Sequence, residues 1–201
     1  MGRLVLSLAV AGLLPCVSAS GQTAASNTWT IDTNHTSAGF SVRHLMVSTV
    51  HGTLGPVKGT IEWDGKSVES VKADVSIDVS GINTGSAARD RDLKSADGLF
   101  ETAKYPTVTF KSKRVISAGS GSFKLVGDLT IHGVTKEVTL DVEGPTGPLK
   151  QGEMLRVGAS ATTTINRKDF GISYSRVVEA APVVSDEVKI EIDVEATRRG
   201  L

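Results

Sequence analysis

The sequence is poor in cysteine and in aromatic residues, and both shortages restrict what the protein can be. Its single cysteine, Cys16, lies near the N-terminus, so no disulfide framework holds the rest of the chain together. Aromatic residues make up 4% of the 201 residues, too few for the two aromatic girdles that an outer-membrane barrel needs. We therefore expect a soluble domain that is stabilised by the burial of aliphatic side chains.

Net charge and long apolar runs are also lacking. The 22 Lys and Arg residues balance 22 Asp and Glu residues, whereas a protein that binds nucleic acid needs a basic surface. After the first 20 residues, no apolar run approaches the roughly 20 residues of a transmembrane helix. We predict that nucleic acid is not a partner and that no helix anchors the mature chain in a membrane.

The first 19 residues have the pattern of a Sec-type signal peptide. Arg3 supplies a positive charge, residues 4–14 form an apolar core, and Val17-Ser18-Ala19 is a small-residue cleavage site. Cleavage before Ser20 predicts a protein that is secreted into the bacterial periplasm.

A lipoprotein signal that ends at Cys16 is the alternative, but Leu14 and Pro15 are not the small neighbours that acylation favours. Residues 20–28 are small and polar, which predicts a flexible lead-in. The remaining pattern runs without a break in composition, so we assign residues 29–197 to one domain.

Most of that domain alternates apolar and polar residues with the period of a β-strand. The clearest example runs from Val71 to Val79, and the last run, Val184 to Val194, repeats it. Eight to ten such strands can hide their apolar faces in a closed antiparallel barrel or in a sandwich. The choice matters because an eight-stranded barrel can hold one small ligand, whereas a sandwich fills its own interior. Runs of about nine residues favour the barrel.

Residues 83–112 interrupt the strand pattern with a helix-forming composition. Pro106 ends this stretch and biases Tyr105 towards extended geometry, so a strand resumes directly after it. We predict a crossover with two short helical turns. The residues available to cap them are Asn83, Thr84 or Ser86 for the first turn and Ser95 or Asp97 for the second.

Catalytic and metal-binding groups form no motif. The four histidines, His35, His44, His51 and His132, lack metal-ligand spacing, and no G-x-S-x-G elbow is present. His44 has the same strand phase as Phe40 and Val42, so its side chain can point inward. There it is either a hydrogen-bonded core histidine or a catalytic group. We predict no catalytic residue, no metal site and no enzymatic activity, with a hydrolase-like enzyme in the same barrel as an alternative.

Four segments carry a resemblance to a known family: GFSVRHLMVSTVHGTL (39–54), RDRDLKSADGLFETAKYPTVTFKS (89–112), LVGDLTIHGVTKEVTLDV (125–142) and INRKDFGISY (165–174). In this order they resemble the YceI-like family of secreted, polyisoprenoid-binding, lipocalin-like proteins. The resemblance implies an all-β fold, an eight-stranded antiparallel lipocalin-like barrel with a short helical insert between central strands. It also implies an apolar tunnel for a long isoprenoid, quinone-like or similar amphipathic lipid, with no other cofactor.

The predicted ligand-binding residues are the inward positions of the strands together with one side of the crossover. Leu93, Leu99 and Phe100 are expected to form a lid, with Arg89 near a polar head group. Many relatives have a histidine where this chain has Asp92, which puts any contact made by that histidine in doubt. The full set is Phe40, Val42, His44, Val75, Ile77, Arg89, Asp92, Leu93, Leu99, Phe100, Val108, Phe110, Leu129, Ile131, Ala159 and Ala161.

Other interpretations remain open for the same residues. The apolar positions can simply pack one another, and residues 89–92 can be a solvated helix face. A β-sandwich interaction or stress protein without a ligand is the rival function. The pattern also leaves room for transient membrane contact and for a homodimer.

Overall fold

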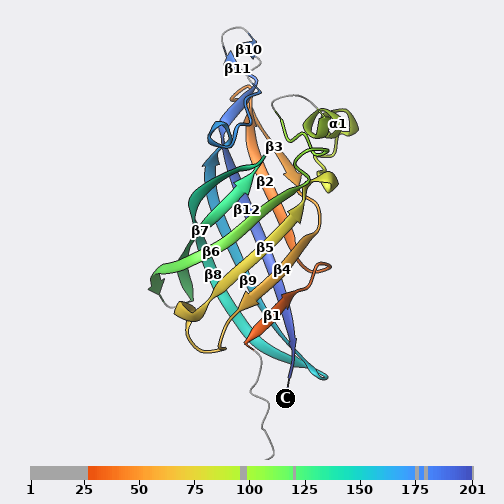
Figure 1. The fold of residues 1–201 in the computed structure, drawn as a ribbon. Helices are drawn as coiled ribbons and strands as arrows, with labels where there is room; N and C mark the ends of the chain where they lie inside the picture. The colour runs from red at the N-terminus through yellow and green to blue at the C-terminus, as the bar shows by residue number, and fades with distance from the viewer. Residues whose placement is uncertain (1–26, 96–98, 120, 175–176, 179–180, 201) are drawn as a thin grey trace, which may run out of the picture.

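The structure is a computed structural model that describes residues 27–95, 99–119, 121–174, 177–178 and 181–200, which are mostly antiparallel β-strand (Figure 1). The strands are β1 (Thr28–Ile31), β2 (Ser37–His44), β3 (Ser48–Thr53), β4 (Val57–Glu62), β5 (Lys72–Asp78), β6 (Thr107–Gly119), β7 (Ser122–Ile131), β8 (Val134–Gln151), β9 (Met154–Asn166), β10 (Val177–Val178), β11 (Ala181–Pro182) and β12 (Val184–Arg199). The helical elements are α1 (Ala87–Ser95) and the 3-10 turns η1 (Val68–Ser70), η2 (Val79–Gly81) and η3 (Arg167–Phe170).

The short strand β1 closes the sheet into a barrel. One of its edges pairs with β4, where Trp29 lies opposite Ile61, and the other pairs with β12, where Thr30 lies opposite Thr197. The ring therefore runs β1-β4-β5-β6-β7-β8-β9-β12 and returns to β1, which makes eight strands. The predicted closed barrel is confirmed, and the sandwich alternative is wrong.

At the other end of the barrel, the hairpin β2–β3 takes the place of β1 beside β12 (Figure 1). The outer edge of β3 is not covered by another strand of the ring. Among the described residues, its one backbone pairing on that edge is a bridge from Thr53 to Asn83, with N···O distances of 2.8 and 2.9 Å. Asn83 opens the crossover, so the helical insert begins where the ring of strands is incomplete.

The structure corrects several predicted boundaries. Val79 does not extend β5 but starts η2, because the side chain of Asp78 accepts a hydrogen bond from the amide of Ser80 (2.9 Å). Residues 144–152 have the Gly and Pro content that is typical of a loop, but most of them belong to the 18-residue strand β8. Register shifts between β8 and β9 accommodate their two Gly-Pro pairs within the ladder.

In the described part of the crossover, the first predicted helical turn is part of the helix α1. The hydroxyl of Ser86 accepts from the amide of Arg89 (3.5 Å), as expected of a cap at the start of α1. Residues 96 and 97 of the second predicted turn lie outside the described residues. Beyond them the chain folds back on α1: the amides of Phe100 and Thr102 donate to the last carbonyls of the helix, at 3.0 and 2.9 Å. Those carbonyls thereby gain partners at the end of α1.

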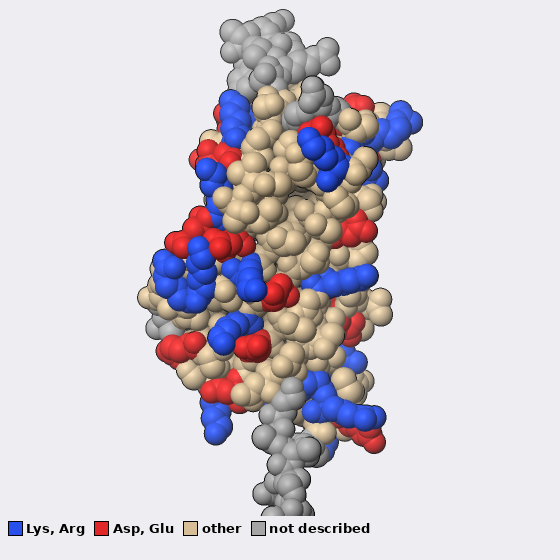
Figure 2. All heavy atoms as spheres, viewed as in Figure 1, with Lys and Arg blue, Asp and Glu red and all other residues tan. Residues whose placement is uncertain are grey.

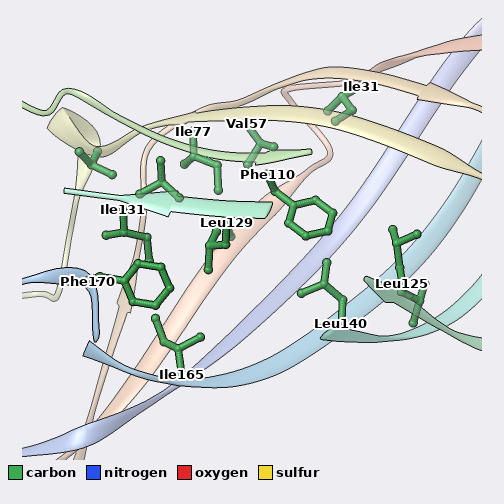
Figure 3. Packing of buried hydrophobic residues seen from close by; sticks show 14 of the residues in the cluster. Ile31, Val57, Ile77, Phe110, Leu125, Leu129, Ile131, Leu140, Ile165 and Phe170 are labelled. Atoms are coloured by element: carbon green, nitrogen blue, oxygen red, sulfur yellow. The ribbon is translucent and has the colours of Figure 1, made fainter. Parts of the chain in front are cut away.

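The alternation along the strands separates the two faces of the barrel wall. Figure 2 shows blue and red side chains intermixed over the outer surface. Figure 3 shows the apolar side chains of Ile77, Phe110, Leu129 and Ile165 pointing into the space between the strands. These residues are at most 9% exposed, so the core is the inside of the barrel.

Gly59 provides a test of this wall. It lies inside β4 with φ of 145°, and a Cβ there would overlap the carbonyl oxygen of Asp74 in β5. We expect Gly59→Ala to lower the free energy of unfolding in urea by about 3 kcal/mol, through overpacking and backbone strain. Gly65→Ala is the control, because Gly65 also has positive φ but faces open space; it should cost about 1 kcal/mol. Equal losses would show that the close approach of β5 is not what requires a glycine.

Candidate ligand-binding cavity

The barrel encloses a cavity of about 790 Å³. Its wall is formed by the inward-facing residues of the strands, most of them aliphatic or aromatic. This volume lies within the range of about 300–1,000 Å³ that is usual for small-molecule sites. The side chains therefore leave space inside the barrel and do not only pack against one another.

All sixteen residues predicted from the sequence lie on the cavity wall. They come from β2, β5, β6, β7 and β9, and from both arms of the crossover. Asp78, adjacent to Ile77, is exposed, as the alternation of β5 requires. The structure thus brings the predicted set together around one space, while their contact with a ligand stays a prediction.

Two tryptophans, which are not among the residues predicted from the sequence, close the end of the barrel near β1. The indole nitrogen of Trp29 donates to the carbonyl of Trp63 (3.1 Å), and the ring centroids are 5.9 Å apart. The guanidinium of Arg198 lies 4.6 Å from the ring centre of Trp29, within the range of a cation–π contact. Both rings line the cavity and are at most 6% exposed, so this end is apolar and closed off from solvent.

Polar groups gather at the opposite end, around Thr84 of the crossover. The carboxylate of Asp90 accepts from the amide (2.9 Å) and the hydroxyl (2.5 Å) of Thr84. The guanidinium of Arg89 donates to the hydroxyl and the carbonyl oxygen of the same residue, both at 2.7 Å. The hydrogen bond from the Thr84 hydroxyl is the main cause that holds the pKa of Asp90 below its ordinary value.

These contacts qualify the role predicted for Arg89. The residue lines the cavity, but two of its three guanidinium nitrogens are already bound to Thr84. Thr84 and Ser86 also line the cavity and were missed, because small polar residues in a loop have no periodicity that could indicate their direction.

The second arm of the crossover is fastened to the barrel by side chains. Leu99 and Phe100 are partly buried against the main core. Glu101 forms a hydrogen-bonded pair with the ring of His132 in the β7–β8 turn, and the Tyr105 ring lies 4.3 Å from that of His132. In contrast, no side chain of α1 is buried. The helix is therefore held mainly at its two ends.

Arg167 places a buried cation on the cavity wall at the same end. It is 6% exposed and donates to the carbonyls of Ser185 (3.0 Å) and Ile172 (2.8 Å) and to the carboxylate of Asp186 (2.9 Å). Lys168 pairs with the same carboxylate at 2.8 Å and is the main cause of the lowered pKa of Asp186. Arg167 thus joins η3 to the start of β12.

Within the described residues, one group of side chains has the donor atoms and spacing of a metal site: Asp32, His35 and Glu195. Arg156 already pairs with both carboxylates, at 3.1 Å from Asp32. Hydrogen bonding by His35, followed by smaller effects that include Arg156, lowers the pKa of Asp32. The guanidinium occupies the position that a cation would take, so these residues fit an ion-pair network.

Both the sequence and the fold of this chain match a known family. The sequence model described as "YceI-like domain" matches residues 29–196. The chain belongs to the YceI-like family. A curated relative, a UPF0312 protein of Staphylococcus aureus strain N315, is 38% identical over 170 residues, which cover 83% of this chain and 95% of the relative. No helix in the described part of this YceI-like chain has the length and hydropathy to span a bilayer.

Solved structures show the same fold. The YceI protein of Campylobacter jejuni is 33% identical with a TM-score of 0.66, over 79% of this chain and 90% of that one. BcnA of Burkholderia cenocepacia is 21% identical with a TM-score of 0.69, over 82% and 98%. A polyisoprenoid binding domain from Saccharophagus degradans is 20% identical with a TM-score of 0.60, over 85% and 98%. At 20 and 21% identity, the last two establish the fold alone.

The link between Asp90 and Thr84 predicts an acid-sensitive start of the crossover. Folding lowers the pKa of Asp90, so its hydrogen bonds to Thr84 stabilise the folded state fully above the ordinary pKa of 3.8. This stabilisation is lost as the pH falls through the lower pKa of the folded state. We expect the Thr84 amide to lose its hydrogen-exchange protection below pH 3.8, and Asp90→Ala to remove it at neutral pH. Asp74→Ala, on the outside of β5, is the control. Protection that survives Asp90→Ala would contradict this account.

Proposed function

We propose that this YceI-like protein binds one long-chain isoprenoid or similar amphipathic lipid inside its barrel and stores or carries it without converting it chemically. The observation that carries the proposal is the cavity of about 790 Å³, enclosed by apolar side chains inside a closed barrel. The cavity wall is long, because it extends from Trp29 and Trp63 at one end to the crossover at the other.

The energetics favour a hydrocarbon chain. Each buried methylene group contributes about 0.8 kcal/mol, so a few isoprene units supply the roughly 8 kcal/mol of micromolar affinity and a surplus against the costs of binding. Such a ligand needs few polar contacts. The small residues Ala159 and Ala161 leave room for the chain on the β9 side of the cavity.

The distribution of polar groups supports an amphipathic ligand with one orientation. Near Trp29 and Trp63 the lining is mostly apolar, with the unpaired indole N–H of Trp63 as a single polar group, and a charged head there would lose its hydration. At the crossover end Arg89 and Arg167 line the cavity, and each guanidinium keeps N–H groups beyond those already bound within the protein. We therefore place the hydrocarbon tail towards the tryptophans and the head group at the crossover end.

One structural neighbour supports the proposed ligand, and the N-terminal signal-peptide pattern supports the proposed location. The structural neighbour from Saccharophagus degradans is described as a polyisoprenoid binding domain, and a lipid ligand for this chain agrees with that description. The N-terminal pattern, which lies outside the described residues, supports export to the bacterial periplasm by a Sec-type signal peptide. There a carrier would shield a lipid chain from water.

Native mass spectrometry of the purified protein, followed by solvent extraction, tests the proposal. We expect a co-purified lipid in the native protein and its loss in Ala161→Trp, because an indole inside the cavity takes the space of the chain. Thr164→Trp is the matched control, since Thr164 lies on the same strand with its side chain exposed. A native protein that neither carries nor takes up isoprenoid, quinone-like or fatty lipids would contradict the proposal.

Phe100 tests whether the crossover acts as a lid. We expect Phe100→Ala to raise the rate of lipid release about fivefold, because an aromatic side chain no longer covers the hydrocarbon. The measurement is displacement of a fluorescent lipid, with thermal unfolding of the empty protein beside it. Ile116→Ala, an exposed position at the far end of β6, should leave the rate unchanged. A lower melting temperature with an unchanged release rate would show that the crossover is only a structural plug.

A further inference from the structure

The turn between β2 and β3 exposes apolar side chains next to the cavity. His44, the last residue of β2, lines the cavity, and the turn follows it directly. Met46 is 56% exposed and Val47 82%, among the largest exposures of any apolar side chain in the described residues. The apolar surface of the cavity wall is thus adjacent in sequence to an apolar surface on the outside.

The backbone of this turn is strained in a way that its residues do not explain. Leu45 and Met46 both have positive φ, 48° and 58°, in a turn closed by a hydrogen bond from the Val47 amide to the His44 carbonyl (3.0 Å). Hairpin turns of this kind ordinarily carry Asn, Asp or Gly at such positions. Bulky apolar residues there disfavour the turn, and strain of this type concentrates at functional sites.

The turn is held rigidly in spite of this strain. The guanidinium of Arg43 donates to the carbonyls of Met46 (2.9 Å) and Val47 (3.3 Å) and to the hydroxyl of Thr49 (3.0 Å). The amide of Leu45 donates to the carbonyl of Val183 at the start of β12 (3.0 Å). Met46 and Val47 are therefore presented to solvent in a fixed arrangement.

The sequence on both sides of the turn carries charge of one sign. Residues 33–61, which include the whole hairpin, contain no Asp or Glu, whereas Arg43 and Lys58 are basic. Arg43 forms no ion pair among the described residues. In β12, which pairs with β2 beside the turn, Asp186 is paired with Arg167 and Lys168, and the side chain of Glu187 is exposed. Figure 2 shows an uncharged region running up the middle of this face towards the same end of the molecule.

We propose that the β2–β3 turn, with Met46 and Val47 inserted and Arg43 beside them, docks the protein on the surface of an anionic lipid bilayer at the cavity end where ligand enters. This inference rests on the proposed function, since a lipid of the proposed class resides in a membrane before it is bound. Apolar side chains at the interface, with cations next to them, are the elements that surface-bound proteins use. Docking places the open edge of β3 and the crossover against the bilayer, so the hydrocarbon chain can move into the barrel without crossing water.

The test is sedimentation with ligand-free vesicles, made either from phosphatidylcholine alone or from phosphatidylcholine mixed with phosphatidylglycerol. The variant is Met46→Gly/Val47→Ser, which removes both exposed side chains and gives the positive-φ position a glycine, so its melting temperature should stay equal or rise. The control is Ile116→Ser/Leu149→Ser, which removes comparable exposed apolar surface at the other end of the barrel. We expect native protein and control to sediment with the mixed vesicles, and the variant to bind about tenfold more weakly.

A second measurement separates this inference from the proposed function. Uptake of a fluorescent isoprenoid is followed from the mixed vesicles and from a cyclodextrin complex. The docking inference expects the variant to take up lipid normally from cyclodextrin and about tenfold more slowly from vesicles. Equal vesicle binding by variant and native protein overturns docking, whatever the uptake shows. Absence of uptake by the native protein from both sources overturns the proposed lipid binding, and sedimentation then still decides whether the turn binds membranes.

Discussion

The pairing of β1 with both β4 and β12 is the constraint on which the rest of the structure depends. The four residues of β1 pair with β4 on one edge and, through Thr30 and Ile31, with the last strand on the other, and so convert an open sheet into a ring. A closed ring of eight strands has an interior whose diameter is set by strand number and tilt, not by the side chains inside. With Val, Ile and Ala at many inward positions, that interior is not filled, and a cavity of about 790 Å³ follows.

Because β1 is short, it cannot close the barrel at the opposite end. β1 occupies only one part of the edge of β12, and the β2–β3 hairpin takes the remainder. The free edge of β3 is then met by the crossover through the bridge between Thr53 and Asn83. The helical insert completes a wall that strands leave incomplete, and its polar side chains join Arg167 of η3 in the polar part of the cavity lining. One end of the cavity is therefore apolar and sealed by tryptophans, and the other is polar and made of the least buried element.

Both ends of the crossover are fixed by side chains, whereas the helix between them is not. Asp90 and Thr84 hold the start, and Glu101, Tyr105 and His132 hold the end. Elements with few buried contacts open at lower free energy than the barrel strands do. The same region that makes the cavity polar is thus the region best able to let a ligand pass, and the exposed β2–β3 turn lies at that end.

The sequence by itself determined the faces of the strands, because a period of two assigns each residue of an extended chain to one side of a sheet. That rule was sufficient for Val75, Ile77, Ala159 and Ala161, and the resemblance of four segments to the YceI-like family supplied the closed barrel. Residues outside regular strands had no such rule. Thr84, Arg167 and Trp63 reach the cavity only because of how loops and strand ends are placed by the closed ring.

Only the tertiary structure decided where strands end and which groups meet. The register of β8 with β9 carries two Gly-Pro pairs through a ladder that local sequence predicts as a loop. Residues 99–105 fold back onto α1, where hydrogen bonds to the carbonyls of Leu93 and Lys94 satisfy the end of the helix. The exposure of Met46 and Val47 likewise depends on contacts with Arg43 and β12. Periodicity reports the direction of a side chain relative to its own strand, whereas closure, register and long-range hydrogen bonds place that strand in space.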